Sequence, residues 1–390
     1  MTKKKSIYTK DVILVMAASF FFMFGTMFIN PLINGYAKSL GASSAFAGLI
    51  VGIMSIAAMF LRPVAGNLTD RFSKYRLSLI GGILIFIGIL GYILTPTSQW
   101  LLLFRLINGA GYVLCTVCMT TWLAFLVPRE HVGEAMGFYG LMNALAMAVA
   151  PAISINLYQK IGYRHSIYLA SASALLMILA IQFVGDHALP KKNAAKKKKG
   201  FKIIQGNVLP VAILTTLFAL PYFTTQADIV TYVEQRHINV AVGSYFMIYA
   251  VILLVIRIGL KTYFDTVRFG IWFWISTVAT AAYILLLGFM NNNWEMALAA
   301  AGMAVGYGVI YSVLQSTALL LAPISEQGLA SSTFYLGLDI GMSLGPILSG
   351  IVDSLLPIEW FYPVELVIIP IAVIVYFSYR KRLNGAIDDH

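Results

Sequence analysis

The sequence predicts an all-α membrane protein in which twelve transmembrane helices form two six-helix bundles, related to each other as parallel repeats. Three observations support this fold class: the apolar composition, a series of apolar stretches of helical length, and an internal repeat. Hydrophobic residues make up 59% of the 390 residues and charged residues only 11%, whereas roughly 25% of an average soluble domain is charged. A chain of this composition is expected to be solvated by lipid.

Twelve stretches are long and apolar enough to span a bilayer, whose hydrocarbon core of about 30 Å needs about 20 helical residues. Their predicted ranges are 12–37, 46–67, 77–95, 100–125, 133–157, 165–185, 207–234, 243–262, 269–289, 295–321, 328–354 and 361–379. Because they recur along the whole chain, a single cleaved signal segment does not explain them.

A lysine-rich segment over 186–206 separates predicted bundles over 12–185 and 207–379, with a lead over 1–11 and a tail over 380–390. Its basic residues are Lys191, Lys192, Lys196, Lys197, Lys198, Lys199 and Lys202. Two interpretations are open: the lysines fix the topology and rest on anionic lipid head groups, or they bind a regulatory partner. The composition predicts a flexible tether.

Lysine and arginine residues outside the spans collect on one side of the predicted topology. The other side holds only Lys38, Lys160, Arg164 and Arg236. By the positive-inside rule, both termini and the lysine-rich segment are expected in the cytosol, and the protein in the cell membrane. The formal charge of +11 is then a property of topology, and we expect no nucleic acid as a partner.

An internal repeat relates the two halves. A shift of 195 residues superimposes identical residues, namely Arg62 on Arg257, Asp70 on Asp265, Gly133 on Gly328, Pro151 on Pro346 and Ser154 on Ser349. Because the shift covers six spans, equivalent helices cross the membrane in the same direction and the repeats are parallel. Transporters with parallel repeats rock their two bundles about a central site.

The segment between the second and third spans is Gly66-Asn67-Leu68-Thr69-Asp70-Arg71-Phe72-Ser73-Lys74-Tyr75-Arg76. It resembles the loop signature of the major facilitator superfamily, with Ser73 in place of the usual Gly and Lys74 in place of Arg. A carboxylate at Asp70 is expected to meet the positive end of a neighbouring helix. The resemblance implies a conformational latch, formed when the cytosolic side is closed, that consists of Gly66, Asp70, Arg71, Lys74 and Arg76. Its second-half copy is degenerate.

Two further stretches resemble signatures of the same family. Residues 101–111 in the fourth span contain Arg105, which relatives link to proton coupling, and Asn108 where Gln or His is commoner. An alternative role for Arg105 is to bond backbone carbonyls. The antiporter signature is represented by 146–151 and by its better-preserved copy, 341–346. Small residues there allow close helix packing, so a helix-packing motif is predicted at Pro151, Gly341, Gly345 and Pro346.

Two carboxylates lie well inside predicted spans, Asp228 in the seventh and Asp339 in the eleventh. A carboxyl group in a low dielectric favours its neutral form, so it can load and release a proton. The candidates for proton coupling are therefore Arg105, Asp228 and Asp339, although Asp339 has a structural acid as its alternative. The first half has no mid-span acid, which weakens an assignment to the export of cationic drugs.

Polar side chains in several spans are candidates to bind the substrate. They are Asn30, Asn34, Asn108, Asn143, Gln226, Tyr307, Tyr311 and Gln315. The last three recur at helical spacing on one face, for which a packing role is the alternative.

The motifs together resemble the twelve-span drug/metabolite:proton antiporter branch of the family. The resemblance implies a secondary active transporter for a small amphipathic molecule, with proton-coupled efflux as the first hypothesis and proton-coupled uptake of a nutrient or metabolite as the alternative. We expect no enzyme, because the spans offer no nucleophile with a base. No metal is expected, since the five histidines show no ligand spacing, and no cofactor beyond H⁺ as the coupling ion. The expected partners are a small-molecule substrate and membrane lipids, and the protein is expected to be a monomer.

Overall fold

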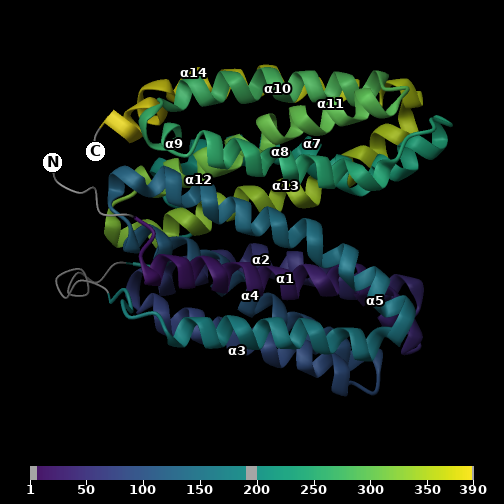
Figure 1. The fold of residues 1–390 in the computed structure, drawn as a ribbon, viewed down its shortest axis with the longest axis horizontal. Helices are drawn as coiled ribbons and strands as arrows, with labels where there is room; N and C mark the ends of the chain where they lie inside the picture. Colours follow the sequence, from purple (N-terminus) through teal and green to yellow (C-terminus); the bar gives the residue numbers. More distant parts are fainter. Residues whose placement is uncertain (1–6, 190–199, 389–390) are drawn as a thin grey trace. The chain divides into compact units, whose positions relative to one another are not determined.

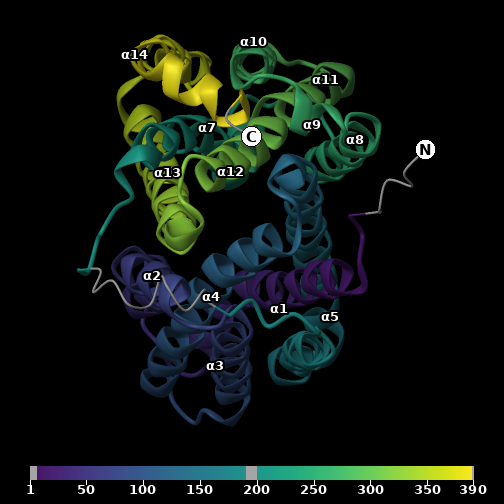
Figure 2. The same ribbon diagram turned by 90° about the vertical axis from the view of Figure 1, so that its left-hand side faces the viewer.

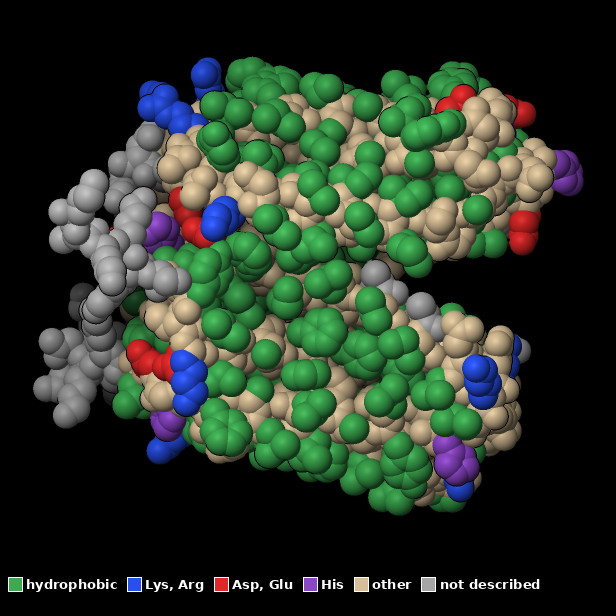
Figure 3. Space-filling model, in the orientation of Figure 1, with side chains coloured by type: hydrophobic (Ala, Val, Ile, Leu, Met, Phe, Trp, Pro, Cys, Tyr) green, Lys and Arg blue, Asp and Glu red, His purple; other side chains and the backbone are tan. Residues whose placement is uncertain are grey.

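The computed structural model describes residues 7–189 and 200–388, which contain helices and no strand. Within these residues, twelve helical segments are long and apolar enough to cross a membrane. The predicted fold class is therefore confirmed. Charged side chains lie near the helix ends, and hydrophobic side chains cover the sides between them (Figure 3). Large apolar groups such as Phe60 and Trp294 are 77% and 78% exposed, as expected of surfaces that face lipid rather than water.

The first compact unit contains the four helices at the start of the chain and most of the fifth. Their bounds are α1 Lys10–Ser39, α2 Ser44–Arg71, α3 Lys74–Leu94, α4 Ser98–Leu126 and α5 Val132–Gln182. Thr9 and Ser43 cap α1 and α2 by accepting backbone amides through their hydroxyls. Helix α4 packs against α1, α2 and α3 (Figures 1 and 2).

Helix α5 holds two spans, because it breaks at Gly162. That residue has φ of 78° and ψ of 172°, a backbone conformation that favours glycine. Gly162 lies between the fifth and sixth predicted spans, 133–157 and 165–185, so the break falls in the expected connection.

The second compact unit contains the remaining helices. They are α7 Leu209–Gln235, α8 Tyr245–Gly259, α9 Tyr263–Thr266, α10 Phe269–Phe289, α11 Asn293–Met303, α12 Ile310–Leu320, α13 Gln327–Leu355 and α14 Ile368–Asp388. A π-helical segment, Ala304–Val309, joins α11 to α12 within one span. Helix α10 packs against α11 and α14, and α14 packs against α7.

The two units differ from the sequential halves at two short segments. Residues Arg129–Leu141, which include the first turns of α5, belong to the second unit, and Ile324–Ser332, which include the first turns of α13, belong to the first. The last helix has non-helical backbone angles at Tyr379 (φ −120°, ψ 15°), where the predicted span ends, and helical residues continue beyond it through the expected tail. Leu383 and Ala386 are buried there, and Asn384 accepts the Gly270 amide at 2.8 Å.

Candidate functional site

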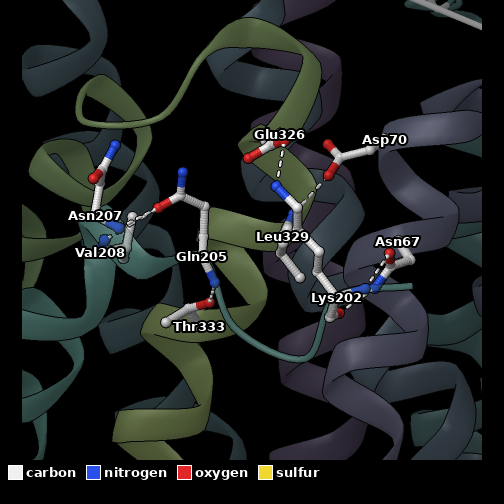
Figure 4. A network of polar contacts seen from close by, with 9 residues as sticks. All are labelled: Asn67, Asp70, Lys202, Gln205, Asn207, Val208, Glu326, Leu329 and Thr333. Atoms are coloured by element: carbon white, nitrogen blue, oxygen red, sulfur yellow. Dashed lines mark hydrogen bonds and ion pairs between the residues drawn. The ribbon is translucent and has the colours of Figure 1, made fainter. Parts of the chain in front are cut away.

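The carboxylate of Asp70, in the last turn of α2, caps the start of α13. Its Oδ1 accepts the amide of Gly328 at 2.7 Å, and its Oδ2 accepts that of Leu329 at 3.0 Å. Figure 4 shows the contact with Leu329. The first amides of a helix have no partner within the helix and form the positive end of its dipole. Asp70 therefore makes the kind of contact that its motif predicted, and the structure identifies the helix.

Glycine is required on both sides of this contact. A Cβ on Gly328 would lie 2.6 Å from the carbonyl oxygen of Gly66, and one on Gly66 would lie 2.7 Å from the Cβ of Ser332. Ser332 also donates its hydroxyl to the carbonyl of Arg62 at 2.6 Å. The backbones of α2 and the first turns of α13 are thus in direct contact.

We expect Gly328→Ala to lower the free energy of unfolding by about 1–3 kcal/mol, because the added methyl group cannot fit without moving one backbone. Thermal unfolding of the purified protein measures the change. Gly350→Ala, in the same helix, is the matched control, since a Cβ there meets no atom within 4 Å. Equal losses in the two variants would contradict the close-packing explanation.

The basic residues of the motif differ in burial. The Lys74 side chain is 6% exposed, and its ammonium lies 5.8 Å from the ring centre of Phe125 in α4. Arg71 and Arg76 are exposed. Of the five residues assigned to the latch, the structure thus brings Gly66 and Asp70 to α13.

The second-half copy of this contact is better preserved than the sequence indicated. Asp265, in α9, accepts the amide of Glu134 at 2.9 Å through Oδ1, so it caps α5 as Asp70 caps α13. A Cβ on Gly133 would lie 2.4 Å from the carbonyl oxygen of Phe264. The shift of 195 residues, which pairs both aspartates and both glycines, was the signal that could have predicted this cap.

The end of the lysine-rich segment is attached to the first unit. Lys202 forms an ion pair with Glu326 at 2.9 Å, and its backbone carbonyl accepts the Asn67 amide group at 2.6 Å (Figure 4). In the second unit, the backbone of Gln205 donates to the hydroxyl of Thr333 at 2.9 Å. The other six lysines of the segment lie outside the described residues, namely Lys191, Lys192, Lys196, Lys197, Lys198 and Lys199.

The tether prediction can now be divided at Lys202. Replacing the six preceding lysines by glutamine, or shortening 191–199, should leave transport unchanged. Lys202→Gln removes an ion pair whose lysine side chain is 51% exposed, so it should cost at most about 1 kcal/mol. Thermal unfolding and flux measured on each variant test this, and a loss of flux on shortening 191–199 would contradict it.

Arg105 and Asn30, two predicted site residues, are hydrogen-bonded partners. The guanidinium donates to Oδ1 of Asn30 at 2.9 Å, and Arg105 is 3% exposed. The described partner is thus a side chain rather than the backbone carbonyls of the alternative interpretation. A buried intramembrane arginine held by a neutral amide keeps its charge available to a ligand.

The other predicted polar residues of the first unit have different surroundings. Asn108 donates to the Ile85 carbonyl at 3.4 Å and lies against Gly88, so it packs α4 onto α3. Asn143 is 4% exposed and neither amide atom has a hydrogen-bond partner. Asn34, and Gln226 in the second unit, are exposed.

The predicted polar face of the tenth span is buried in aromatic packing. Tyr307 stacks on Tyr222 with ring centres 4.1 Å apart, and its ring lies 5.9 Å from that of Tyr311. Gln315 donates to the hydroxyl of Tyr335 at 3.0 Å, and its own oxygen has no partner. The described contacts on this face are thus the packing contacts of the alternative interpretation.

Three acids of the second unit, Asp339, Asp228 and Glu365, are buried or partly buried. Asp339 is 1% exposed in the middle of α13. Asp228 accepts the hydroxyl of Ser349 at 2.5 Å, beside a cavity of about 50 Å³ that is also lined by Asp353. Glu365, which the sequence placed near a span end, has a buried Oε2 without a hydrogen-bond partner. Its burial could not be predicted, because the sequence does not show which helices cover it.

The helix-packing motif of α13 lies against α7. A Cβ on Gly341 would lie 2.6 Å from the Cβ of Ala219, and one on Gly345 would lie 3.0 Å from the Leu220 carbonyl oxygen. Pro346 is exposed, and Pro151 is partly buried in α5.

Two buried arginines, equivalent by the repeat, were not selected from the sequence. Arg62 is 0% and Arg257 1% exposed. Arg62 donates to the hydroxyl of Thr116. Arg257 donates to the hydroxyl of Ser312 and, at 2.6 Å, to the carbonyl of Gly308 in the π-helical segment. Because burying an arginine inside a membrane span is costly, the position of both arginines within predicted spans could have marked them as candidate functional residues.

Comparison with known proteins agrees with this architecture. The family model of the Major Facilitator Superfamily matches residues 15–290. An uncharacterized MFS-type transporter of Methanocaldococcus jannaschii is 21% identical over 373 residues, which are 90% of this chain and 94% of that protein. The multi-drug resistance efflux pump PmrA of Streptococcus pneumoniae is 26% identical over 204 residues, half of each chain. The crystal structure of the human organic anion transporter MFSD10 superimposes with a TM-score of 0.78 at 14% identity and covers 94% of this chain and 98% of that one.

Proposed function

This chain belongs to the Major Facilitator Superfamily and is a multi-pass membrane transporter, and on that premise we propose that it exports a small amphipathic drug or metabolite in exchange for protons. The substrate is exposed to each side of the membrane in turn by alternating access. The protein lies in the cell membrane with both termini in the cytosol, and H⁺ is the coupling ion.

The observation that carries the coupling proposal is the placement of carboxyl groups inside spans of the second unit. Asp339 is buried, and the partly buried Asp228 pairs with Ser349. Among the described acids of the first unit, none is buried, and its interior charge is instead Arg105 held by Asn30. A carboxyl group in an apolar interior is stable when neutral, so loading and releasing a proton changes its free energy strongly.

The same placement limits the substrate class. A binding site that combines a buried guanidinium with neutral amides favours a polar or anionic head group over a simple cation. Asn143 of the same unit, whose amide has no partner, is our proposed contact for the rest of the molecule. The efflux function named for the similar pump of Streptococcus pneumoniae supports the direction of transport.

Purified protein in liposomes with an imposed pH gradient tests both the coupling and the direction. Candidate amphipathic anions, zwitterions and cations are supplied outside, and their accumulation is followed. An antiporter concentrates its substrate in the acidic lumen, whatever the orientation of the protein. Accumulation in an alkaline lumen instead establishes symport and therefore the uptake alternative. If the flux of every transported candidate is independent of the pH gradient, proton coupling is excluded.

A further inference from the structure

Three potential metal ligands meet where α5 begins. His131 directly precedes α5, Glu134 lies in its first turn, and Asp265 comes from α9 of the same unit. The donor atoms of the three side chains all lie within 4.8 Å of one another. Glu134 is 7% exposed, and the side chains of His131 and Asp265 are 34% and 8% exposed.

The distances fit ligands around an ion better than ligands bonded to each other. His131 Nδ1 lies 3.6 Å from Asp265 Oδ2, which is too long for a hydrogen bond, and this nitrogen has no hydrogen-bond partner. Two ligands bound to one tetrahedral Zn²⁺ at about 2.0–2.2 Å are roughly 3.4 Å apart. The other oxygen of Asp265 accepts the Glu134 amide at 2.9 Å, which fixes the orientation of the carboxylate.

The charges favour a cation at this position. The carboxylates of Glu134 and Asp265 lie close together, and neither side chain is exposed. Two carboxylates in a partly desolvated place repel each other, and a divalent ion removes that repulsion.

The first-half copy shows that the helix cap does not need these ligands. At the positions equivalent to His131 and Glu134, the other copy has Glu326 and Leu329. Asp70 nevertheless caps α13 through two amides, and Glu326 pairs with Lys202. The cap itself therefore does not require an imidazole or a second carboxylate.

We propose that His131, Glu134 and Asp265 bind a divalent transition-metal ion, and that Zn²⁺ is the ion this set of one nitrogen and two carboxylate ligands fits best. Zinc accepts histidine and carboxylate ligands in tetrahedral geometry, and a water molecule completes the set on the exposed side of His131. The ion would join the start of α5 to α9, so its effect is to strengthen the cap made by Asp265.

The test uses the full-length protein purified in detergent through a tag without histidines. Calorimetric titration with ZnCl₂ is expected to give one site per chain and a raised unfolding temperature, while MgCl₂ at the same concentrations gives neither. His131→Gln and Glu134→Gln should each weaken Zn²⁺ binding by about tenfold or more. His165→Gln, an exposed histidine elsewhere, and Glu326→Gln, the first-copy equivalent of His131, should bind as the wild type does.

Absence of saturable Zn²⁺ binding would overturn the proposal, and so would equal binding by the wild type and both ligand variants. If a ligand variant does not fold, the wild type titrated with Co²⁺ decides the matter. The intense visible absorption of four-coordinate cobalt supports the site, and the weak absorption of six-coordinate cobalt overturns it. None of these measurements depends on transport.

Discussion

Asp339→Asn is expected to abolish accumulation driven by a pH gradient while leaving substrate binding and exchange without a gradient intact. The amide imitates a permanently protonated carboxyl group, so the coupled proton can be neither taken up nor released. Asp339 is 1% exposed in the middle of α13. An acid that faces water therefore cannot take over its role as proton carrier in the variant. Gradient-driven flux and counterflow in liposomes measure the two activities separately.

Matched variants decide which carboxyl group carries the proton. Asp228→Asn and Glu365→Gln change the other interior acids of the second unit by the same chemistry, and Ser349→Ala removes only the hydroxyl partner of Asp228. If Asp339 is structural instead, its amide variant loses thermal stability, because its partners are left unsatisfied. A stable Asp339→Asn protein with normal gradient-driven accumulation removes this residue from the mechanism, and the variant that loses coupling then identifies the carrier.

Asp70→Asn is expected to reduce transport severely in a protein that still folds and inserts. The carboxylate accepts two amides at the positive end of α13, and a neutral amide keeps only one acceptor oxygen and no charge. A charge at a helix end contributes about 0.3–1 kcal/mol when exposed and up to about 2 kcal/mol when partly buried. A loss of about 1–2 kcal/mol changes the population of the latched state by about 5- to 30-fold, whereas global stability changes little.

Asp265→Asn provides the comparison, because that residue caps α5 in the equivalent way. We expect the single variants to impair flux to similar degrees and the double variant to be worse than either. Transport is measured beside thermal unfolding for all three. Normal flux in Asp70→Asn would exclude the latch, and a collapse of thermal stability would mean that the contact is part of the folded core.

The fold was predictable because composition and span length alone determine it. Apolar stretches of sufficient length must become helices in lipid, where unpaired backbone groups are costly. The break in α5 was predictable as well, since Gly162 lies between the predicted spans 133–157 and 165–185. The difference lies after residue 379, where helical residues continue because Asn384 and Leu383 find partners within the unit.

The candidate site was predictable only for residues whose role is local. The sequence could assign Asp70 to a helix end, but not to α13, whose amides are 258 and 259 residues away along the chain. Asn108 was expected in a cavity, and it packs against α3 because Gly88 leaves room for it. Glu365 was passed over because its position near a span end says nothing of the side chains that bury it.

The winding of the tenth span gives the two repeats different mechanical properties. Its equivalent, α4, is regular from Ser98 to Leu126, whereas Ala304–Val309 has the wider π turn. Such a turn leaves its carbonyls poorly matched to the helix ladder, and Arg257 bonds one of them, that of Gly308. Rewinding the turn into an α-helix would rotate the residues from Ile310 to Leu320 about the helix axis, including Tyr311 and Gln315. The second repeat thus has a π-helical turn about which its following helix can rotate, and Arg257 holds that turn by its hydrogen bond to Gly308. The equivalent helix of the first repeat has no such turn.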